Sequence, residues 1–192
     1  YWRKEIPIQT IDNILQFYND HFPKNAIHLL FTSNHDENSH SGSEYERLGD
    51  AVKTFAVLTS TWSNSTPLVY SGQEAANQKR LNFFDKDVID WSNGYPLNDF
   101  YKTLLQLHKA NPALRAADEK GTTARISTDT NNKLFGFLRK NGDSEVLVFL
   151  NLSQDYYWMH LTDDRVGGNF KNVFTNELND ITRNRYFEMR PW

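Results

Sequence analysis

The sequence predicts an α/β segment followed by an all-β segment. Up to about Leu114, helical patterns alternate with short apolar runs, and after it one strand pattern follows another. Helices that alternate with short buried strands are typical of a parallel sheet, whereas strands joined by tight turns are typical of an antiparallel one. We place the boundary near residues 116–121, which gives predicted units 1–116 and 117–192.

Composition narrows the class of protein. The 192 residues suffice for one domain or two small ones, and 39% hydrophobic with 23% charged residues is ordinary for a globular chain. A net charge of −3 argues against a nucleic-acid binder, which needs a basic face. No apolar run approaches the roughly 18 residues that span a bilayer. Cysteine is absent, which excludes disulfides but leaves both a cytoplasmic and a bacterial exported (periplasmic, surface or secreted) location open.

In the first unit, apolar side chains at helical spacing predict a helix over about 10–22, capped by Thr10. The continuous apolar run 26–32 predicts a strand buried on both faces. The same reasoning predicts a helix over 48–62, a strand over 67–70 and a helix over 98–110 capped by Asn98.

In the second unit, the segments 122–128, 133–139 and 145–152 predict strands. Asn141-Gly142 lies between the last two and is a strong hairpin signal. Weaker strand patterns cover 157–160, 172–174 and 186–189, so we expect a small antiparallel sandwich. Aromatic residues make up 14% of the chain, and the run Tyr156-Tyr157-Trp158 cannot face inward as a whole on a strand, so it is a candidate sugar-stacking surface as well as core.

The sharpest candidate site is the segment Asn34-His35-Asp36, which leaves a predicted buried strand and enters a polar loop. An ionised Asp can accept two sugar hydroxyls, and a neighbouring His can donate to a third. Asn and Asp are also common turn residues, so the pattern alone leaves a structural role open. Glu37 and Asn38 follow directly and are candidates for a substrate loop.

A second cluster, Gly72-Gln73-Glu74, follows the next predicted strand. Since parallel strands end at the same edge of a sheet, we expect these residues beside Asp36. For Gln73 and Glu74, as for Asn34, the pattern favours a structural, hydrogen-bonding role at this rim over catalysis.

These segments resemble the α-amylase family, glycoside hydrolase family 13. Residues 31–36 look like the family motif at the end of barrel strand seven, and residues 67–74 look like the region at strand eight. Residues 84–91, 100–114 and 134–152 resemble the following loop, the last barrel helix and the first strands of the C-terminal sandwich. The resemblance therefore implies the last part of a (β/α)8 barrel (a TIM barrel) over 1–116 and a C-terminal antiparallel β-sandwich over 117–192.

The resemblance also implies a role for each matching residue. Family members cleave α-glucosidic bonds with retention, using one nucleophilic carboxylate and one acid/base carboxyl. Asp36 matches the third catalytic carboxylate, which stabilises the transition state and holds substrate, and His35 matches a substrate-binding histidine.

The resemblance leaves a gap upstream. The family's nucleophile and acid/base lie at strands four and five, and nothing before Asp36 resembles those motifs. Only 35 residues precede Asp36, whereas a complete barrel takes about 250. We therefore expect a fragment of an α-1,4-glucan hydrolase acting on starch or maltooligosaccharides, inactive by itself.

Other functions remain open, as do the chain's partners. The alternative functions are those of an α-1,6-glucosidase, a trehalose- or sucrose-active relative, a transglycosylase, and a non-catalytic glucan-binding or scaffold relative. We expect no metal or other cofactor on this segment, with calcium an option for the full-length parent. A partial barrel also leaves strand edges open, so we expect association with the missing barrel part or with a second copy.

Overall fold

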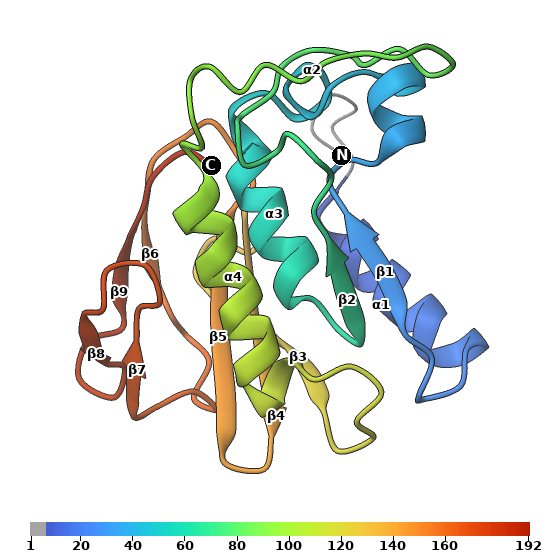
Figure 1. Cartoon of the computed structure of the whole chain (residues 1–192). Coiled ribbons are helices and arrows are strands. Elements are labelled where there is room, and N and C mark those ends of the chain that lie inside the picture. Colours follow the sequence, from blue (N-terminus) through green and yellow to red (C-terminus); the bar gives the residue numbers. More distant parts are fainter. Residues whose placement is uncertain (1–6) are drawn as a thin grey trace.

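The computed structural model describes residues 7–192, so the first six residues of the predicted unit 1–116 lie outside the described part (Figure 1). The first unit contains four α-helices and two strands among the described residues. In chain order they are α1 (Gln9–His21), β1 (His28–Phe31), α2 (Glu44–Leu48), α3 (Val52–Thr61), β2 (Ser65–Leu68) and α4 (Asn98–Ala110). A π-helical turn, Glu37–Ser41, and two 3₁₀ turns, Gly49–Ala51 and Pro112–Leu114, complete it.

β1 and β2 pair in parallel, with Phe31 opposite Leu68, so both strands end at the same edge. The prediction that the first strand is buried on both faces is wrong, because Leu29 is 52% exposed. The physical reason is that β1 has β2 as its single strand neighbour within residues 7–192. A strand at the edge of a two-stranded sheet leaves one edge and part of its surface open.

The predicted helices exist, but three details differ. Thr10 and Asn98 lie inside their helices, and the N-cap positions belong to Ile8 and Leu97, neither of which makes a side-chain cap bond. The predicted helix 48–62 is interrupted near Gly49, whose positive φ of 56° ends α2. Helix α3 then begins at Val52 after a 3₁₀ turn.

The second unit is all antiparallel, as predicted. Its strands are β3 (Thr122–Ile126), β4 (Leu134–Asn141), β5 (Ser144–Asn151), β6 (Tyr157–His160), β7 (Asn169–Lys171), β8 (Leu178–Asp180) and β9 (Tyr186–Met189). The β4–β5 hairpin is confirmed, with Gly142 at a φ of 59° in its turn.

One predicted strand is wrong. Residues 172–174 form the turn between β7 and β8, where the Asn172 side chain accepts hydrogen bonds from the backbone N–H groups of Phe174 and Thr175. An Asn side chain that binds the backbone two residues ahead stabilises a turn instead of a strand.

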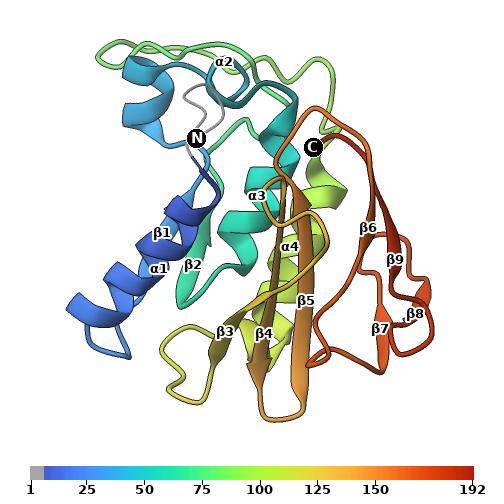
Figure 2. The same ribbon diagram turned by 180° about the vertical axis from the view of Figure 1, so that it is seen from behind.

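The two units share a core. Trp62, at the end of α3, packs its ring 4.9 Å from Phe137 and 5.1 Å from Phe135, and both phenylalanines are fully buried in β4. Arg139 is also buried, and its Nε donates to the Ala113 carbonyl oxygen at 3.0 Å. Helix α3 therefore lies between the parallel pair and the β3–β5 sheet, an arrangement visible from both sides (Figures 1 and 2). No helix among the described residues is long and apolar enough to cross a lipid bilayer.

Candidate functional site

The chain segments that follow β1 and β2 meet above the C-terminal ends of these strands, at the top of Figure 1. The first segment runs through the π-helical turn Glu37–Ser41 into α2, and the second is the long loop between β2 and α4. In α/β folds this edge carries the functional residues, so it is the candidate site.

Asp36 lies at the start of the π-helical turn and projects into solvent. Its side chain is 58% exposed, and its carboxylate lies 3.6 Å from Nε2 of His35, which is 69% exposed. The Asp36 side chain makes no cap bond to the turn that follows it. Asp36 and His35 therefore offer an acceptor and an imidazole side by side to a ligand.

Asn34 shapes the turn that presents these two residues. Its Oδ1 accepts a hydrogen bond from the backbone N–H of Glu37 at 2.7 Å, which closes an Asx turn. Just before it, Thr32 and Ser33 are buried, so the chain leaves the strand through a packed segment. A rigid exit fixes the direction in which His35 and Asp36 point.

Beneath this edge lies a buried hydrogen-bonded network that we call the rim network: Thr32, Glu44, Gln73 and Tyr101. Thr32 Oγ1 donates to Glu44 Oε2 at 2.8 Å, and Gln73 Nε2 donates to Thr32 Oγ1 at 2.7 Å. Gln73 also contacts Glu44 Oε2 and the Tyr101 hydroxyl, and its Oε1 accepts from the backbone N–H of Tyr70. The rim network thereby joins the ends of β1 and β2 to α2 and α4.

Glu44 is the residue of this region that sequence reasoning did not identify. Burial raises the pKa of its carboxyl, while the hydrogen bonds from Thr32 and Gln73 and the charge of Arg47 oppose the shift. A signal was present: Ser43 and Glu46 form a capping box, which marks the start of α2 one residue before Glu44. At 3% exposure, Glu44 supports the site from below and does not reach a ligand.

Glu37 and Asn38, the candidates for a substrate loop, lie in different surroundings. Glu37 is half-exposed and lies 3.6 Å from the guanidinium of Arg47. Asn38 is buried, its Nδ2 donates to the Lys79 carbonyl oxygen, and its Oδ1 accepts from the backbone N–H of Leu81. Asn38 thus fastens the long loop over the π-helical turn, and its side-chain amide faces that loop and not a ligand.

The fastened loop brings aromatic rings to His35. Phe83 packs its ring 6.1 Å from that of His35 and 4.6 Å from that of His40, and Phe84 adjoins Phe83 at 4.8 Å. Phe84 is 89% exposed. Exposed rings next to an imidazole provide both apolar contact and hydrogen bonding for a ligand.

Gly72 and Glu74 hold the turn after β2. Gly72 has a φ of 96°, which residues with a side chain rarely adopt, and a Cβ there would lie 3.1 Å from Asn77 Cβ. Glu74 accepts a hydrogen bond from the Gly72 N–H at 3.0 Å. Both residues therefore maintain the turn that follows β2.

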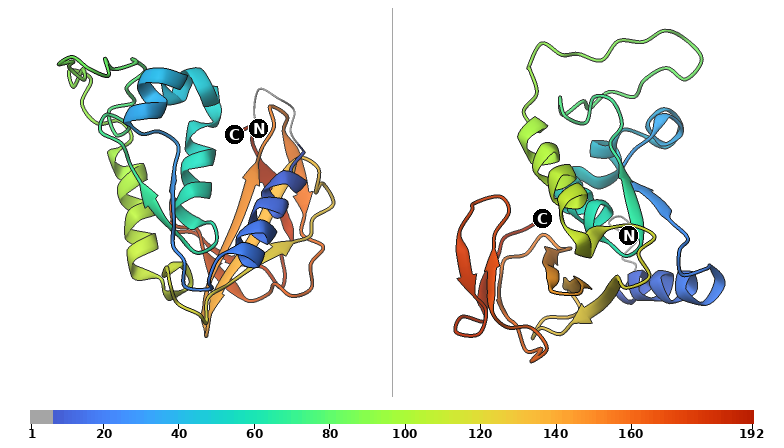
Figure 3. Two further views of the ribbon diagram at one scale, coloured as in Figure 1. Left: turned by 90° about the vertical axis from the view of Figure 1, so that its right-hand side faces the viewer. Right: turned by 60° about the horizontal axis from the view of Figure 1, so that its bottom comes forward.

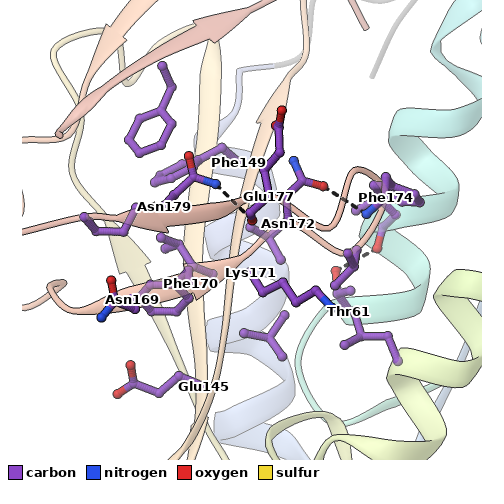
Figure 4. A pocket seen from close by; sticks show the side chains of 18 of the residues that line it. Thr61, Glu145, Phe149, Asn169, Phe170, Lys171, Asn172, Phe174, Glu177 and Asn179 are labelled. Atoms are coloured by element: carbon purple, nitrogen blue, oxygen red, sulfur yellow. Dashed lines mark hydrogen bonds between the residues drawn. The ribbon is translucent and has the colours of Figure 1, made fainter.

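A separate cavity lies away from this edge. It encloses about 730 Å³ between α3, α4, β5 and the β7–β8 hairpin, and Figure 4 shows Lys171 extending across it toward Thr61. Two of its polar residues serve the hairpin, since Asn172 accepts from the Phe174 N–H and Glu177 accepts from Thr175. We therefore interpret it as a gap between the two units, distinct from the candidate site.

Across residues 7–192, no group of three or more His, Asp or Glu side chains is arranged to hold a metal ion.

Comparison with known proteins places this arrangement in context. The sequence is 24% identical to Alpha-amylase 2 of Dictyoglomus thermophilum over 92% of this chain and 31% of that protein. The chain thus spans about a third of this curated relative. No family model matches the sequence.

Solved structures share the fold over nearly the whole chain. A maltogenic α-amylase, AmyB from Thermotoga neapolitana, matches 97% of this chain and 42% of its own, with a TM-score of 0.69 and 18% identity. An α-amylase from Lactobacillus plantarum matches 100% of this chain and 43% of its own, with a TM-score of 0.68 and 19% identity. AmyP, solved in complex with maltose, matches 97% of this chain and 43% of its own, with a TM-score of 0.66 and 16% identity. The chain is therefore similar in sequence to an α-amylase and shares the fold of solved α-amylases over nearly its whole length.

Proposed function

We propose that this chain is the C-terminal part of a retaining α-glycosidase that hydrolyses α-1,4-glucans. In this proposal residues 1–116 form the last part of a (β/α)8 barrel and residues 117–192 form the C-terminal sandwich. The observation that carries the proposal is the exposed Asp36–His35 pair, 3.6 Å apart, at the C-terminal edge of two parallel strands. Asp36 then stabilises an oxocarbenium-like transition state.

The proposal assigns separate tasks to the groups at this edge. The Asp36 carboxylate accepts hydroxyl hydrogen bonds that strengthen as the sugar ring distorts, and His35 hydrogen-bonds a neighbouring sugar oxygen. The rim network keeps the two strand ends in register beneath them, through contacts such as Thr32 Oγ1 to Glu44 Oε2 at 2.8 Å. The nucleophile and the acid/base belong to a part of the protein that this chain does not include.

The choice of an α-glucan has two supports. AmyP, which shares the fold, was solved with maltose and, as its E221Q variant, with maltotriose. In this chain the exposed Phe84 and the Phe83 ring beside His35 provide a surface on which a sugar ring can stack.

The open face of the parallel pair supports the proposal that the chain associates with the missing barrel part or with a second copy. Exposed apolar side chains gather on α1 and on or beside β1; they are Ile14, Phe17, Phe22, Ile27 and Leu29. A contiguous apolar surface next to an unpaired strand edge is typical of an interface. We also propose that this segment holds no essential metal, and that any calcium in the full-length parent binds outside it.

The test is hydrolysis of maltoheptaose by the complete protein that carries this sequence and by the 192-residue chain alone. We expect turnover by the complete protein and none by the chain alone. The Asp36→Asn variant of the complete protein should lose about 10²–10⁴ in kcat, the range typical of a group that acts in the transition state.

The matched control is Asp85→Asn, which removes an exposed carboxylate from the long loop after β2. It should leave kcat within about twofold. Full activity of the Asp36→Asn protein would contradict the assignment of Asp36, and turnover by the 192-residue chain would contradict the view that the two other carboxyls lie elsewhere.

A further inference from the structure

The outer surface of the β6–β9 pair carries aromatic side chains that the proposed function does not use. The two strands are antiparallel, with Trp158 opposite Glu188 and His160 opposite Tyr186. Their inward neighbours are Met159, which is fully buried, and Phe187, which packs against Phe149. The alternation of a strand therefore sends Trp158 and Tyr186 outward, and they are 65% and 59% exposed.

We call this surface the aromatic face and define it by Tyr156, Trp158, His160, Tyr186, Glu188 and Arg190. Its rings form two pairs: Tyr156 and Trp158 lie edge to face with centroids 6.2 Å apart, and His160 stacks on Tyr186 at 4.5 Å. Burying large aromatic rings inside the protein would stabilise the fold, so their exposure on the outer side of the two-stranded β6–β9 sheet needs another explanation.

The polar groups on this face are neutral as a set. Arg190 Nε lies 2.9 Å from Glu188 Oε1, and this pairing raises the pKa of Arg190, with Tyr156 contributing less. The paired charges give no net attraction for a nucleic acid or an acidic peptide. They do supply donors and acceptors beside flat apolar rings, together with the indole N–H of Trp158 and the hydroxyl of Tyr186.

We propose that the aromatic face binds an α-glucan chain at a second site, separate from Asp36. Neutral sugars present flat C–H faces and a rim of hydroxyl groups, which match rings flanked by paired donors and acceptors. That the ligand is a neutral carbohydrate follows from the face itself. That it is an α-glucan rests on the proposed function.

The position of the face supports a site for substrate and not for the missing barrel part. β6 and β9 lie at the side of the molecule away from β1, in Figure 1 and in the right-hand view of Figure 3. The open strand edge and the exposed apolar side chains of α1 and β1, which would meet further barrel strands, therefore point elsewhere. A second glucan site on this side would hold a long polysaccharide near the enzyme while Asp36 acts on one segment of it.

The test is binding of the 192-residue chain to maltoheptaose by titration calorimetry and to amylopectin by affinity gel electrophoresis. We expect Trp158→Ala and Tyr186→Ala each to weaken binding at least about tenfold, as truncation of a central aromatic contact does. The matched control Leu178→Ala removes another side chain of the same unit, 77% exposed on β8, and should leave the affinity unchanged.

The Asp36→Asn chain separates the two sites. We expect this variant to keep the binding that depends on Trp158. This expectation holds even if hydrolysis by the complete protein shows that the proposed role of Asp36 is wrong. Equal glucan affinity of the wild-type and Trp158→Ala chains would overturn the inference, as would loss of all binding in Asp36→Asn. Dimerisation of the chain that Trp158→Ala abolishes, without glucan binding, would also overturn it and assign the face to a protein contact.

Discussion

Strands β4 and β1 are both rich in apolar residues, but they bury these residues to different degrees. In β4, Leu134, Phe135 and Phe137 are fully buried, whereas Leu29 of β1 is 52% exposed. The β3–β5 sheet finds partners within the chain, since α3 and the 3₁₀ turn Pro112–Leu114 pack against it. The β1–β2 pair has α3 on one side and an unpaired strand edge on the other.

This difference in burial shows that a strand's hydrophobicity alone does not decide its contribution to stability. Apolar residues stabilise the fold where the rest of the chain buries them. Truncation of an apolar side chain to alanine should therefore have different effects in the two regions. It also suggests that the polar site beside β1 depends on the rim network for its rigidity, because the surrounding packing is incomplete.

The largest effect is expected from Phe137→Ala. This side chain is fully buried and contacts Trp62 and Phe135, with ring centroids at 4.9 Å and 5.7 Å. We expect a loss of about 3–5 kcal/mol in the free energy of unfolding, measured by urea denaturation. The matched change in the open region, Leu29→Ala, should cost less than about 1 kcal/mol. Equal losses of stability at the two positions would show that Leu29 is packed as tightly as Phe137.

A smaller effect is expected from Asp163→Asn in the all-β unit. The Asp163 carboxylate accepts from Arg165 Nε at 2.8 Å and from the backbone N–H of Ser127 at 3.1 Å, and Arg165 holds its pKa well below the usual range. We expect a loss of about 2 kcal/mol at pH 7, measured by the same denaturation. Because the pKa is lowered in the folded state, this contribution is present above the ordinary Asp pKa and disappears as the pH falls.

The control for this change is the next residue. Asp164 is 98% exposed in its side chain, with Arg185 3.6 Å away. Asp164→Asn should change the stability by less than about 0.5 kcal/mol. A comparable loss in both variants would mean that net charge, and not the Asp163 contacts, is responsible.

The smallest effect is expected from Glu44→Gln in the rim network, and its sign depends on pH. Burial raises the pKa of Glu44, so the folded state holds this proton more tightly than the unfolded chain. The associated stability is present at low pH and is lost as the pH rises through the raised pKa. The Glu44→Gln variant carries no charge at this position. Its free energy of unfolding should therefore exceed that of the wild type by up to about 1 kcal/mol at pH 8, and the difference should shrink toward pH 5.

The same short helix offers a control of opposite sign. Arg80 and the Ser43 backbone lower the pKa of Glu46 to about 2. Glu46→Gln should therefore be less stable than the wild type at neutral pH, and the two should converge as the pH falls toward that value. Thermal unfolding from pH 3 to pH 8 measures both variants. A pH-independent difference for Glu44→Gln would show that its carboxyl is not perturbed in the folded state.

The sequence predicted the element types well because periodicity and turn chemistry are local. The β4–β5 hairpin and strand β6 lie within a residue or two of their predicted positions. The strand predicted over 172–174 failed because Asn172 makes a turn with its own side chain. At the candidate site, Asn34, His35 and Asp36 are consecutive and could be proposed as a unit. The Gln73–Glu44 contact joins residues 29 positions apart, and no local pattern encodes such a pairing.

The buried Arg139 has a consequence for the boundary between the two units. Its Nε donates to the Ala113 carbonyl oxygen and its guanidinium to Thr123 Oγ1, so one cation bridges the end of the helical unit and the first strand of the other. Burial lowers its pKa to about 10, which still leaves it charged at neutral pH. Separating the units would deprive a buried cation of an acceptor and uncover Trp62. The place where helix patterns give way to strand patterns is therefore a change of architecture at which buried contacts hold the two units together.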